Sequence, residues 1–265
     1  MISPQTVDML KSMKMSAMAA EFESQLTDSS YKDLSFEERL GLLVTAEWNR
    51  RQTNRVNRFI RNARFSAPSA TVENIEYYED RHLDKSQILR FSTCQYVDDG
   101  HHIILKGASG NGKTYIACAL GNAACRRFKS VLYIRMPELL DELNIARGCG
   151  ELPKLLKAYK KVDLLIIDEW LIRCLTPQES YDLLEIMEAR CGQQPNRSMI
   201  RVETCFNSFV HQYEPEGWYR RINPDPESDS PISEAIMDRI IHNAFDVTVS
   251  GRISIREHHG LNTVE

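Results

Sequence analysis

The chain has 265 residues and a formal net charge of −4, with 42% hydrophobic and 26% charged residues. This composition suits a globular protein with a sizeable core, and the mildly acidic balance gives no general signal for nucleic-acid binding, although a local patch can still provide one. No stretch approaches the ~20 apolar residues that a membrane span requires, so we expect no membrane partner. The seven cysteines form no C-x-x-C pair, which favours reduced thiols and a cytoplasmic location.

The first predicted element is an amphipathic helix over residues 3–26, which begins with Ser3 and Pro4 in positions that suit a first helical turn. A second helix begins at Ser35, where Ser35 and Glu38 have the spacing of a capping box. Pro68 ends this helical region. We therefore expect a small helical N-terminal domain over residues 1–67 and a larger domain over residues 68–265.

The later part of the second helix is rich in arginine and contains no acidic residue between Arg50 and Arg64. Arginines at helical spacing form a basic stripe, and their guanidinium groups suit the phosphate backbone of DNA. The alternatives are a solvated helix face or arginines that pair with acids elsewhere in the chain. The candidate DNA-binding residues are Arg50, Arg51, Arg55, Arg58, Arg61 and Arg64.

Residues 107–114 read G-x-x-x-x-G-K-T and lie between the apolar run 103–105 and a predicted helix that begins at Lys113. A glycine-rich loop between a strand and a helix directs backbone N–H groups and the positive end of the helix dipole at phosphate. Lys113 can reach the β- and γ-phosphates of ATP, and the Thr114 hydroxyl can ligate Mg²⁺. A glycine-rich turn that binds nothing is the alternative, which this context disfavours. The candidate ATP-binding residues are Gly107, Ala108, Ser109, Gly110, Asn111, Gly112, Lys113, Thr114 and Tyr115.

A second candidate element of the same site is the apolar run 164–167, which leads directly into Asp168 and Glu169. Parallel strands of open α/β sheets place their ligands at the carboxyl ends of the strands. We expect Asp168 to hold Mg²⁺ and Glu169 to act as general base on the attacking water. Without the upstream loop, two solvated acids at a strand end would be an equal explanation.

Further segments alternate between helix and strand, which predicts an α/β fold with a parallel sheet. The predicted strands cover 131–134, 162–167, 198–200 and 245–249, with a possible strand at 253–256. The predicted helices cover 113–128, 137–147, 151–160, 177–191 and 232–242.

Four motifs together resemble the IstB-like ATP-binding proteins, which are AAA+ ATPase helpers of bacterial insertion sequences and relatives of replicative-helicase loaders. The motifs are G-A-S-G-N-G-K-T at 107–114, D-L-L-I-I-D-E-W at 163–170, Y-E-P-E-G-W-Y at 213–219 and E-A-I-M-D-R-I at 234–240. The resemblance implies a P-loop AAA+ parallel-sheet core with a helical N-terminal domain. It also implies a homo-oligomer that assembles with ATP on double-stranded DNA and regulates a partner transposase.

The resemblance assigns further residues. Arg239 matches the arginine finger that reaches the nucleotide of a neighbouring subunit, and Arg256 matches the second-sensor arginine. In the family, the strand near residues 198–200 leads almost directly into the Y-E-P-E-G-W motif, whereas residues 201–211 intervene here. This interruption affects the polar first-sensor residue, for which Gln212 is our first candidate and Asn207 the second. We therefore hypothesise that the protein binds ATP normally and hydrolyses it slowly.

The sequence thus favours a Mg²⁺-dependent ATPase that regulates a transposase on DNA. A replicative-helicase loader has the same fold and chemistry and differs in its partner protein. A small-molecule kinase also uses a phosphate loop, but it has little use for Glu169 or for the arginine stripe. An ATP-gated DNA-binding module with little turnover is the fourth alternative, because loss of part of a catalytic constellation can spare ground-state binding.

Overall fold

The computed structural model describes residues 3–191, 198–202, 215–223, 231–241 and 243–250. Contacts divide the chain into two compact units, Met1–Arg58 and Phe59–Glu265. The division expected at residues 67–68 therefore falls earlier in the chain. The reason is that Ala63 and Phe65 belong to the hydrophobic core of the second unit, where the Ala63 carbonyl accepts a hydrogen bond of 2.8 Å from the Tyr133 N–H.

The first unit begins with two helices, where the sequence predicted one over residues 3–26. They are α1, Ser3–Ser12, and α2, Ser16–Thr27. Lys14 has a φ of 59°, and the Met15 N–H reaches back to the Leu10 carbonyl at 2.9 Å. A left-handed residue with this reverse hydrogen bond is the Schellman arrangement that ends a helix. The prediction of a single helix was wrong because this position usually holds glycine.

The long helix α3, Phe36–Asn62, follows a 3₁₀ turn, η1, at Ser29–Asp33. The expected capping box is confirmed at its start. The Ser35 N–H donates to Glu38 Oε2 at 2.7 Å, and the Glu38 N–H donates to Ser35 Oγ at 3.2 Å. These two bonds satisfy backbone donors that the first helical turn leaves open.

The second unit is built on a parallel sheet, in which the described residues form five strands in the order β2-β3-β4-β1-β5. This confirms the predicted α/β class. Strands buried on both faces appear in the sequence as continuous apolar runs, as β1, β2 and β3 do. Their bounds are β1 His102–Lys106, β2 Val131–Arg135, β3 Leu164–Asp168, β4 Ser198–Val202 and β5 Ala244–Thr248.

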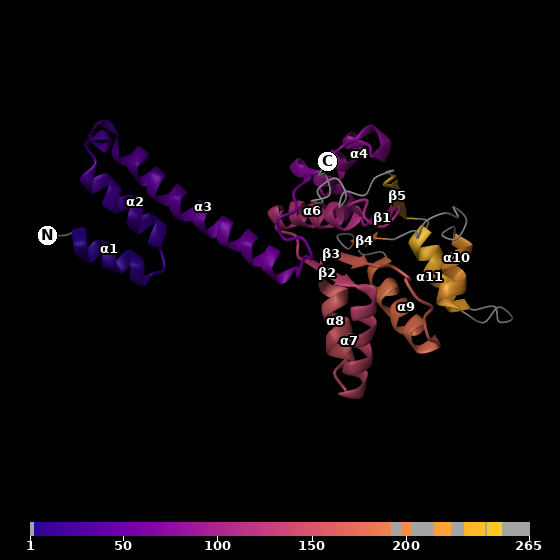
Figure 1. Ribbon diagram of the computed structural model, residues 1–265. Coiled ribbons are helices and arrows are strands. Elements are labelled where there is room, and N and C mark those ends of the chain that lie inside the picture. Colours follow the sequence, from indigo (N-terminus) through magenta and orange to yellow (C-terminus); the bar gives the residue numbers. More distant parts are fainter. Residues whose placement is uncertain (1–2, 192–197, 203–214, 224–230, 242, 251–265) are drawn as a thin grey trace, which may run out of the picture. The chain divides into compact units, whose positions relative to one another are not determined.

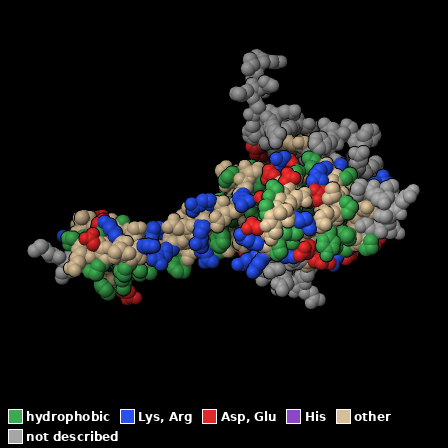
Figure 2. All heavy atoms as spheres, turned by 90° about the horizontal axis from the view of Figure 1, so that it is seen from below, with side chains coloured by type: hydrophobic (Ala, Val, Ile, Leu, Met, Phe, Trp, Pro, Cys, Tyr) green, Lys and Arg blue, Asp and Glu red, His purple; other side chains and the backbone are tan. Residues whose placement is uncertain are grey.

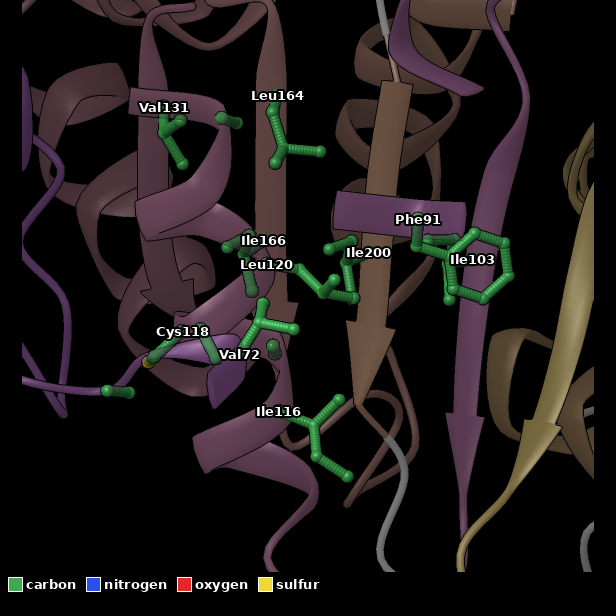
Figure 3. Packing of buried hydrophobic residues seen from close by; sticks show 14 of the residues in the cluster. Val72, Phe91, Ile103, Ile116, Cys118, Leu120, Val131, Leu164, Ile166 and Ile200 are labelled. Carbon is green, nitrogen blue, oxygen red and sulfur yellow. The ribbon is translucent and has the colours of Figure 1, made fainter. Parts of the chain in front are cut away.

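Helices cover both faces of this sheet, with α4 and α6 on one side and α7, α8 and α9 on the other (Figure 1). On the first side, Ile116 and Leu120 of α6 pack toward Ile166 and Ile200 of the sheet (Figure 3). The helical elements are η2 Val72–Asn74, η3 Glu79–Arg81, α4 Lys85–Ser92, α5 Gln95–Asp98, α6 Lys113–Arg126, α7 Met136–Gly148, α8 Leu152–Lys161, α9 Pro177–Cys191, α10 Pro215–Ile222 and α11 Pro231–Ile241.

One buried arginine joins the elements of the second side. Arg190 of α9 is 1% exposed, and its guanidinium donates to the backbone carbonyls of four residues at 2.5–3.1 Å. The accepting residues are Tyr159, Val162, Asp163 and Ser198. A single side chain thus fixes the end of α9 to the starts of β3 and β4.

Candidate functional site

The loop that follows β1 has a conformation that requires glycine. Gly107, Gly110 and Gly112 have φ values of 148°, 86° and 77°. A Cβ atom on Gly107 would lie 2.1 Å from the Val249 carbonyl oxygen, far inside contact distance. Gly112 is the N-cap of α6, so the open N–H groups of the first helical turn and the helix dipole point at the loop. This is the geometry of an anion site.

Lys113 and Thr114, the first residues of α6, connect the loop to β3. The Lys113 side chain is buried, and its Nζ donates to the Ala108 carbonyl at 2.5 Å, across the loop. Thr114 Oγ1 donates to Asp168 Oδ2 at 2.8 Å. The structure therefore brings together three of the predicted residues, although Lys113 and Asp168 lie far apart in the sequence.

Asp168 is 5% exposed and held from several sides. Its Oδ2 also accepts from the Tyr133 hydroxyl at 2.7 Å, and its Oδ1 accepts from the Glu169 N–H at 2.8 Å. Burial and the nearby Asp168 carboxylate raise the pKa of Tyr133 far above its ordinary value, so the hydroxyl stays a donor. The Asp168 carboxylate and the Thr114 hydroxyl present oxygen ligands side by side, which fits a hard cation such as Mg²⁺.

Glu169 has a different environment from its neighbour Asp168. Its φ of 54° is left-handed, a strained conformation for glutamate that often occurs at functional sites. Its Oε1 accepts a hydrogen bond of 2.5 Å from Arg135 Nη2 at the end of β2. This hydrogen bond is the main cause that raises the pKa of Arg135. The candidate general base is therefore tied to an arginine.

A cavity of about 240 Å³ adjoins the start of α6. Arg81 lies buried in its wall and donates to the backbone carbonyls of Glu76 and Asn111, the latter at 2.7 Å. Asn111 Nδ2 in turn donates to the Val249 carbonyl at 3.1 Å. The phosphate loop is therefore fixed both to Arg81 of η3 and to the residue that follows β5. The cavity is lined by Asn74, Ile75, Glu76, Arg81, Gly112, Tyr115 and Ile116.

Among the residues that line this cavity, sequence reasoning had named only Gly112 and Tyr115, as ATP-binding residues. It named no site residue between residues 68 and 100, although Arg81 in this segment holds the loop. Tyr133 was read only as part of the predicted strand 131–134, and Arg135, which follows it, was given no role. Their one signal was the presence of polar groups at the carboxyl end of that strand.

Arg239 of α11 lies apart from this cluster in its described contacts. Its Nη1 donates to the Ala235 carbonyl at 2.9 Å, and its Nη2 donates to Glu188 Oε1 of α9 at 3.0 Å. Gln212, Asn207 and Arg256 lie outside the described residues, as do 253–256. Residues 201 and 202 belong to β4, so the interruption expected at 201–211 begins only after Val202.

Part of the predicted basic stripe is occupied by ion pairs. Glu47, 5% exposed, accepts from Arg50 Nη2 at 2.9 Å and from Arg51 Nε at 2.8 Å. The Arg50 contact is the largest cause that lowers the pKa of Glu47 to about 2. Arg64 lies 3.4 Å from Glu142. The alternative of arginines paired with acids therefore applies to these three.

Arg58 and Arg61, on the last two turns of α3, remain available. Both are exposed, and neither makes an ion pair or hydrogen bond within the described part of the chain. Their spacing of three residues places them on one face of the helix. Lys and Arg side chains are visible along this region in Figure 2.

The profile of a family described as IstB-like ATP binding protein matches residues 8–262. The chain belongs to this family. A Sinorhizobium fredii relative, y4pL, named as an insertion-sequence ATP-binding protein, is 34% identical over 95% of this chain and 96% of its own length. A Pseudomonas fluorescens relative, named as the ATP-binding protein of insertion sequence IS1162, is 37% identical over 73% of this chain and 84% of its own.

Among solved structures, the DnaC helicase loader has a similar fold. It matches with a TM-score of 0.54 and 14% identity, over 68% of this chain and 97% of the loader. The second unit therefore has the P-loop AAA+ fold. Within the described residues, no helix is both long enough and apolar enough to cross a bilayer.

Proposed function

We propose that this protein is a cytoplasmic, Mg²⁺-dependent AAA+ ATPase that assembles on double-stranded DNA and regulates a partner transposase. The observation that carries the proposal is the cluster of Lys113, Thr114, Asp168 and Glu169 at one edge of the sheet. The family's description and the names of the insertion-sequence relatives support ATP and a transposition context.

The residues divide the work of ATP hydrolysis. The loop 107–112 and the first turn of α6 bind the phosphates. When ATP binds, Lys113 Nζ donates to phosphate oxygens in place of the Ala108 carbonyl. Thr114 and Asp168 would hold Mg²⁺, which would supply positive charge to neutralise the β- and γ-phosphates. Glu169 accepts the proton of the attacking water as general base.

The Arg135 contact represents a resting state, because a carboxylate bound to a guanidinium is a weaker base toward water. Turnover then requires that Glu169 leave Arg135. We expect Arg135→Ala to raise the rate of ATP hydrolysis in the absence of DNA about three- to tenfold, measured as phosphate release. Arg135→Lys, which keeps the charge, is the matched control and should change the rate less.

Arg239 acts in trans in this proposal. It is partly exposed and held by the exposed acid Glu188, which it can exchange for the γ-phosphate of a neighbouring subunit. Hydrolysis therefore needs a homo-oligomer formed with ATP. Arg239→Ala should lower turnover about a hundredfold or more and leave ATP binding within a few-fold of wild type, measured by titration with a fluorescent ATP analogue.

DNA contact rests on Arg58 and Arg61, which the described ion pairs leave available. We expect the double variant Arg58→Gln/Arg61→Gln to weaken binding to duplex DNA of any sequence and to lower the salt slope of log K by roughly 2, at about 0.9 per phosphate contact. Lys11→Gln, an exposed change elsewhere in the first unit, should leave the slope unchanged. An unchanged slope in the double variant would refute this interface.

The deciding experiment compares ATP hydrolysis with and without double-stranded DNA for wild type and Glu169→Gln. DNA-stimulated phosphate release that the variant loses supports the proposal. ATP and DNA binding without turnover in wild type supports the ATP-gated module instead. No effect of DNA on hydrolysis would count against the arginine stripe, and a phosphorylated product would favour a kinase.

The replicative-helicase loader remains the second candidate. The likeness to the DnaC loader favours it at the level of fold, while the insertion-sequence relatives favour a transposase partner. Co-purification of the protein with a transposase or with a helicase from the source cell separates the two.

A further inference from the structure

Tyr133 of β2 connects the candidate metal ligand Asp168 to the chain that follows α3. The tyrosine is 6% exposed, and its hydroxyl donates to Asp168 Oδ2 at 2.7 Å. Its backbone N–H donates to the Ala63 carbonyl at 2.8 Å. Because α3 ends at Asn62, one residue lies between the end of that helix and the candidate ATP site at two hydrogen bonds' distance.

The place of Tyr133 in the sheet accounts for both bonds. Among the described strands β2 lies at one edge, so an N–H on its outer side is open, and the Ala63 carbonyl satisfies that of Tyr133. Tyr133 is the register partner of Ile166, which faces α6 in Figure 3. Side chains alternate along a strand, so Asp168 lies on the same face as Ile166, within reach of the tyrosine hydroxyl.

The segment that holds the tyrosine is itself firmly packed. We call residues 63–66 the α3 connector. Arg64 has a φ of 59° and turns the chain between Ala63, at the edge of β2, and Phe65. Phe65 is 6% exposed, and a Cβ atom on Gly121 of α6 would lie 2.5 Å from its ring. The ring thus packs directly on the backbone of α6, and glycine is needed there to admit it.

The α3 connector holds both polar groups of Tyr133. The Ala63 carbonyl accepts from its N–H. Burial and the Asp168 carboxylate raise the pKa of Tyr133, and a side-chain hydrogen bond with Ser66 lowers it. The Ser66 side chain therefore lies at the hydroxyl that holds Asp168. A tyrosine side chain has only two torsions, so contacts at both ends leave it little freedom.

The position of Asp168 in turn sets the direction of the Thr114 hydroxyl, which donates to the same Oδ2. A hydroxyl has one hydrogen and two lone pairs. Because the hydrogen is directed at Asp168, the lone pairs point elsewhere and are open to a cation. Mg²⁺ demands near-ideal octahedral geometry, whereas Ca²⁺ tolerates irregular geometry, so a displaced Asp168 should disturb Mg²⁺ more than Ca²⁺.

We propose that Tyr133 is a positioning residue for the Mg²⁺–ATP site and couples this site to the end of α3. Its hydroxyl fixes the Asp168 carboxylate, and the α3 connector fixes Tyr133. The inference rests on the proposed function, because it takes ATP to bind at the loop and DNA to bind at Arg58 and Arg61. Arg61 lies two residues before Ala63, so DNA that contacts it acts directly on the connector.

The first experiment measures the affinity for a fluorescent, non-hydrolysable ATP analogue in Mg²⁺, in Ca²⁺ and in EDTA. For Tyr133→Phe we expect the affinity in Mg²⁺ to fall about tenfold, the typical effect of losing a hydrogen bond to a metal ligand. The affinity in Ca²⁺ should fall about twofold or less, and the affinity in EDTA should stay the same.

The matched control is Tyr96→Phe, which also removes a buried tyrosine hydroxyl from the second unit and should change none of the three affinities. A merely structural role of Tyr133 predicts equal losses in all three conditions. Equal losses, or no loss in Mg²⁺, would overturn the positioning role.

The second experiment tests the coupling by measuring the affinity for the same analogue in Mg²⁺ with and without saturating duplex DNA. We expect DNA to change the wild-type affinity about threefold or more, and this effect to vanish in Tyr133→Phe and persist in Tyr96→Phe. Ser66→Ala keeps the Tyr133 hydroxyl, so it should reduce the DNA effect and keep the preference for Mg²⁺.

A DNA effect that survives Tyr133→Phe, or a wild type that binds DNA and analogue without any effect of one on the other, would overturn the coupling. A wild type that binds no analogue or no DNA would refute the proposed function, and this inference with it. A wild type that binds both, with Tyr133→Phe behaving in the same way in both experiments, would refute this inference alone.

Discussion

The two units of this chain differ in which side chains they bury and which they leave exposed. In the second unit, Arg190 and Asp168 are buried in the core, and several hydrogen bonds hold each of them. In the first unit, Trp48 and Val44 are exposed, and one buried carboxylate, Glu47, joins α3 to the start of α2. The described part of the second unit thus buries polar anchors within its core, whereas the first unit leaves large apolar side chains exposed.

Among the variants that test this contrast, Arg190→Met has the largest expected effect. The variant leaves four buried carbonyl groups without their donor, so we expect a loss of about 3–5 kcal/mol in unfolding free energy. The measurement is urea unfolding, with hydrogen exchange to show that α1 and α2 keep their protection. Lys154→Met, an exposed change on α8, should cost almost nothing. Equal loss of protection in both units would break the comparison.

The next largest effect is expected for ATP affinity, when a glycine of the phosphate loop is replaced. Gly107→Ala drives a Cβ atom against the Val249 carbonyl oxygen, and the loop must shift to relieve the overlap. We expect ATP affinity to fall more than about tenfold, by analogy with the cost of 1–3 kcal/mol for strained backbone. Isothermal titration with a non-hydrolysable analogue measures it. Gly148→Ala, where an added Cβ meets nothing within 4 Å, is the control and should bind normally.

In the first unit the corresponding anchor is Glu47. Glu47→Gln weakens its bonds to Arg50 and to the start of α2, at a cost of about 1–2 kcal/mol confined to this unit. Its pKa is lowered to about 2 from an ordinary 4.5, so its contribution is complete above pH 4.5 and is lost as the pH falls toward 2. The difference in helix melting between wild type and variant, followed by circular dichroism, should shrink over that range. A difference that is constant from pH 6 to pH 2.5 would contradict this role.

The smallest expected effect has the opposite sign. Gly41 lies inside α3, where an added Cβ atom meets nothing within 4 Å. Gly41→Ala should stabilise the helix by about 0.5–1 kcal/mol, because alanine has less freedom to lose on folding. The same substitution is therefore harmful at Gly107 and helpful at Gly41, and thermal melting of the two variants sharpens the comparison. A destabilised Gly41→Ala would mean that this face of α3 is already covered in solution.

Local patterns carried most of what the sequence could predict. Continuous apolar runs identified β1, β2 and β3, and the glycine spacing identified the loop with Lys113 and Thr114, because each of these patterns depends on neighbouring residues. The sequence did not predict that Tyr133 and Arg135 belong to the site. Their contacts with Asp168 and Glu169 depend on β2 lying beside β3. The order of strands in a sheet is not visible in any short segment.

Two other features that were not predicted, the ion pairs of Glu47 and the helix α10, do have a visible pattern in the sequence. Glu47 precedes Arg50 and Arg51 by three and four residues, the spacing at which helical side chains pair. The stripe was read from Arg50 onward, so this acid was left out of the count. The helix α10 was missed because its residues were treated only as a motif, although they carry an amphipathic pattern.

The position of β4 bears on the candidate ATP site. Because β4 lies between β3 and β1 and all three are parallel, its end at Val202 is at the same edge as Asp168 and Gly107. The chain therefore leaves β4 between the candidate magnesium ligand and the phosphate loop. We therefore expect a change of chain length after Val202 to alter the lifetime of the ATP-bound state more than the packing of the sheet.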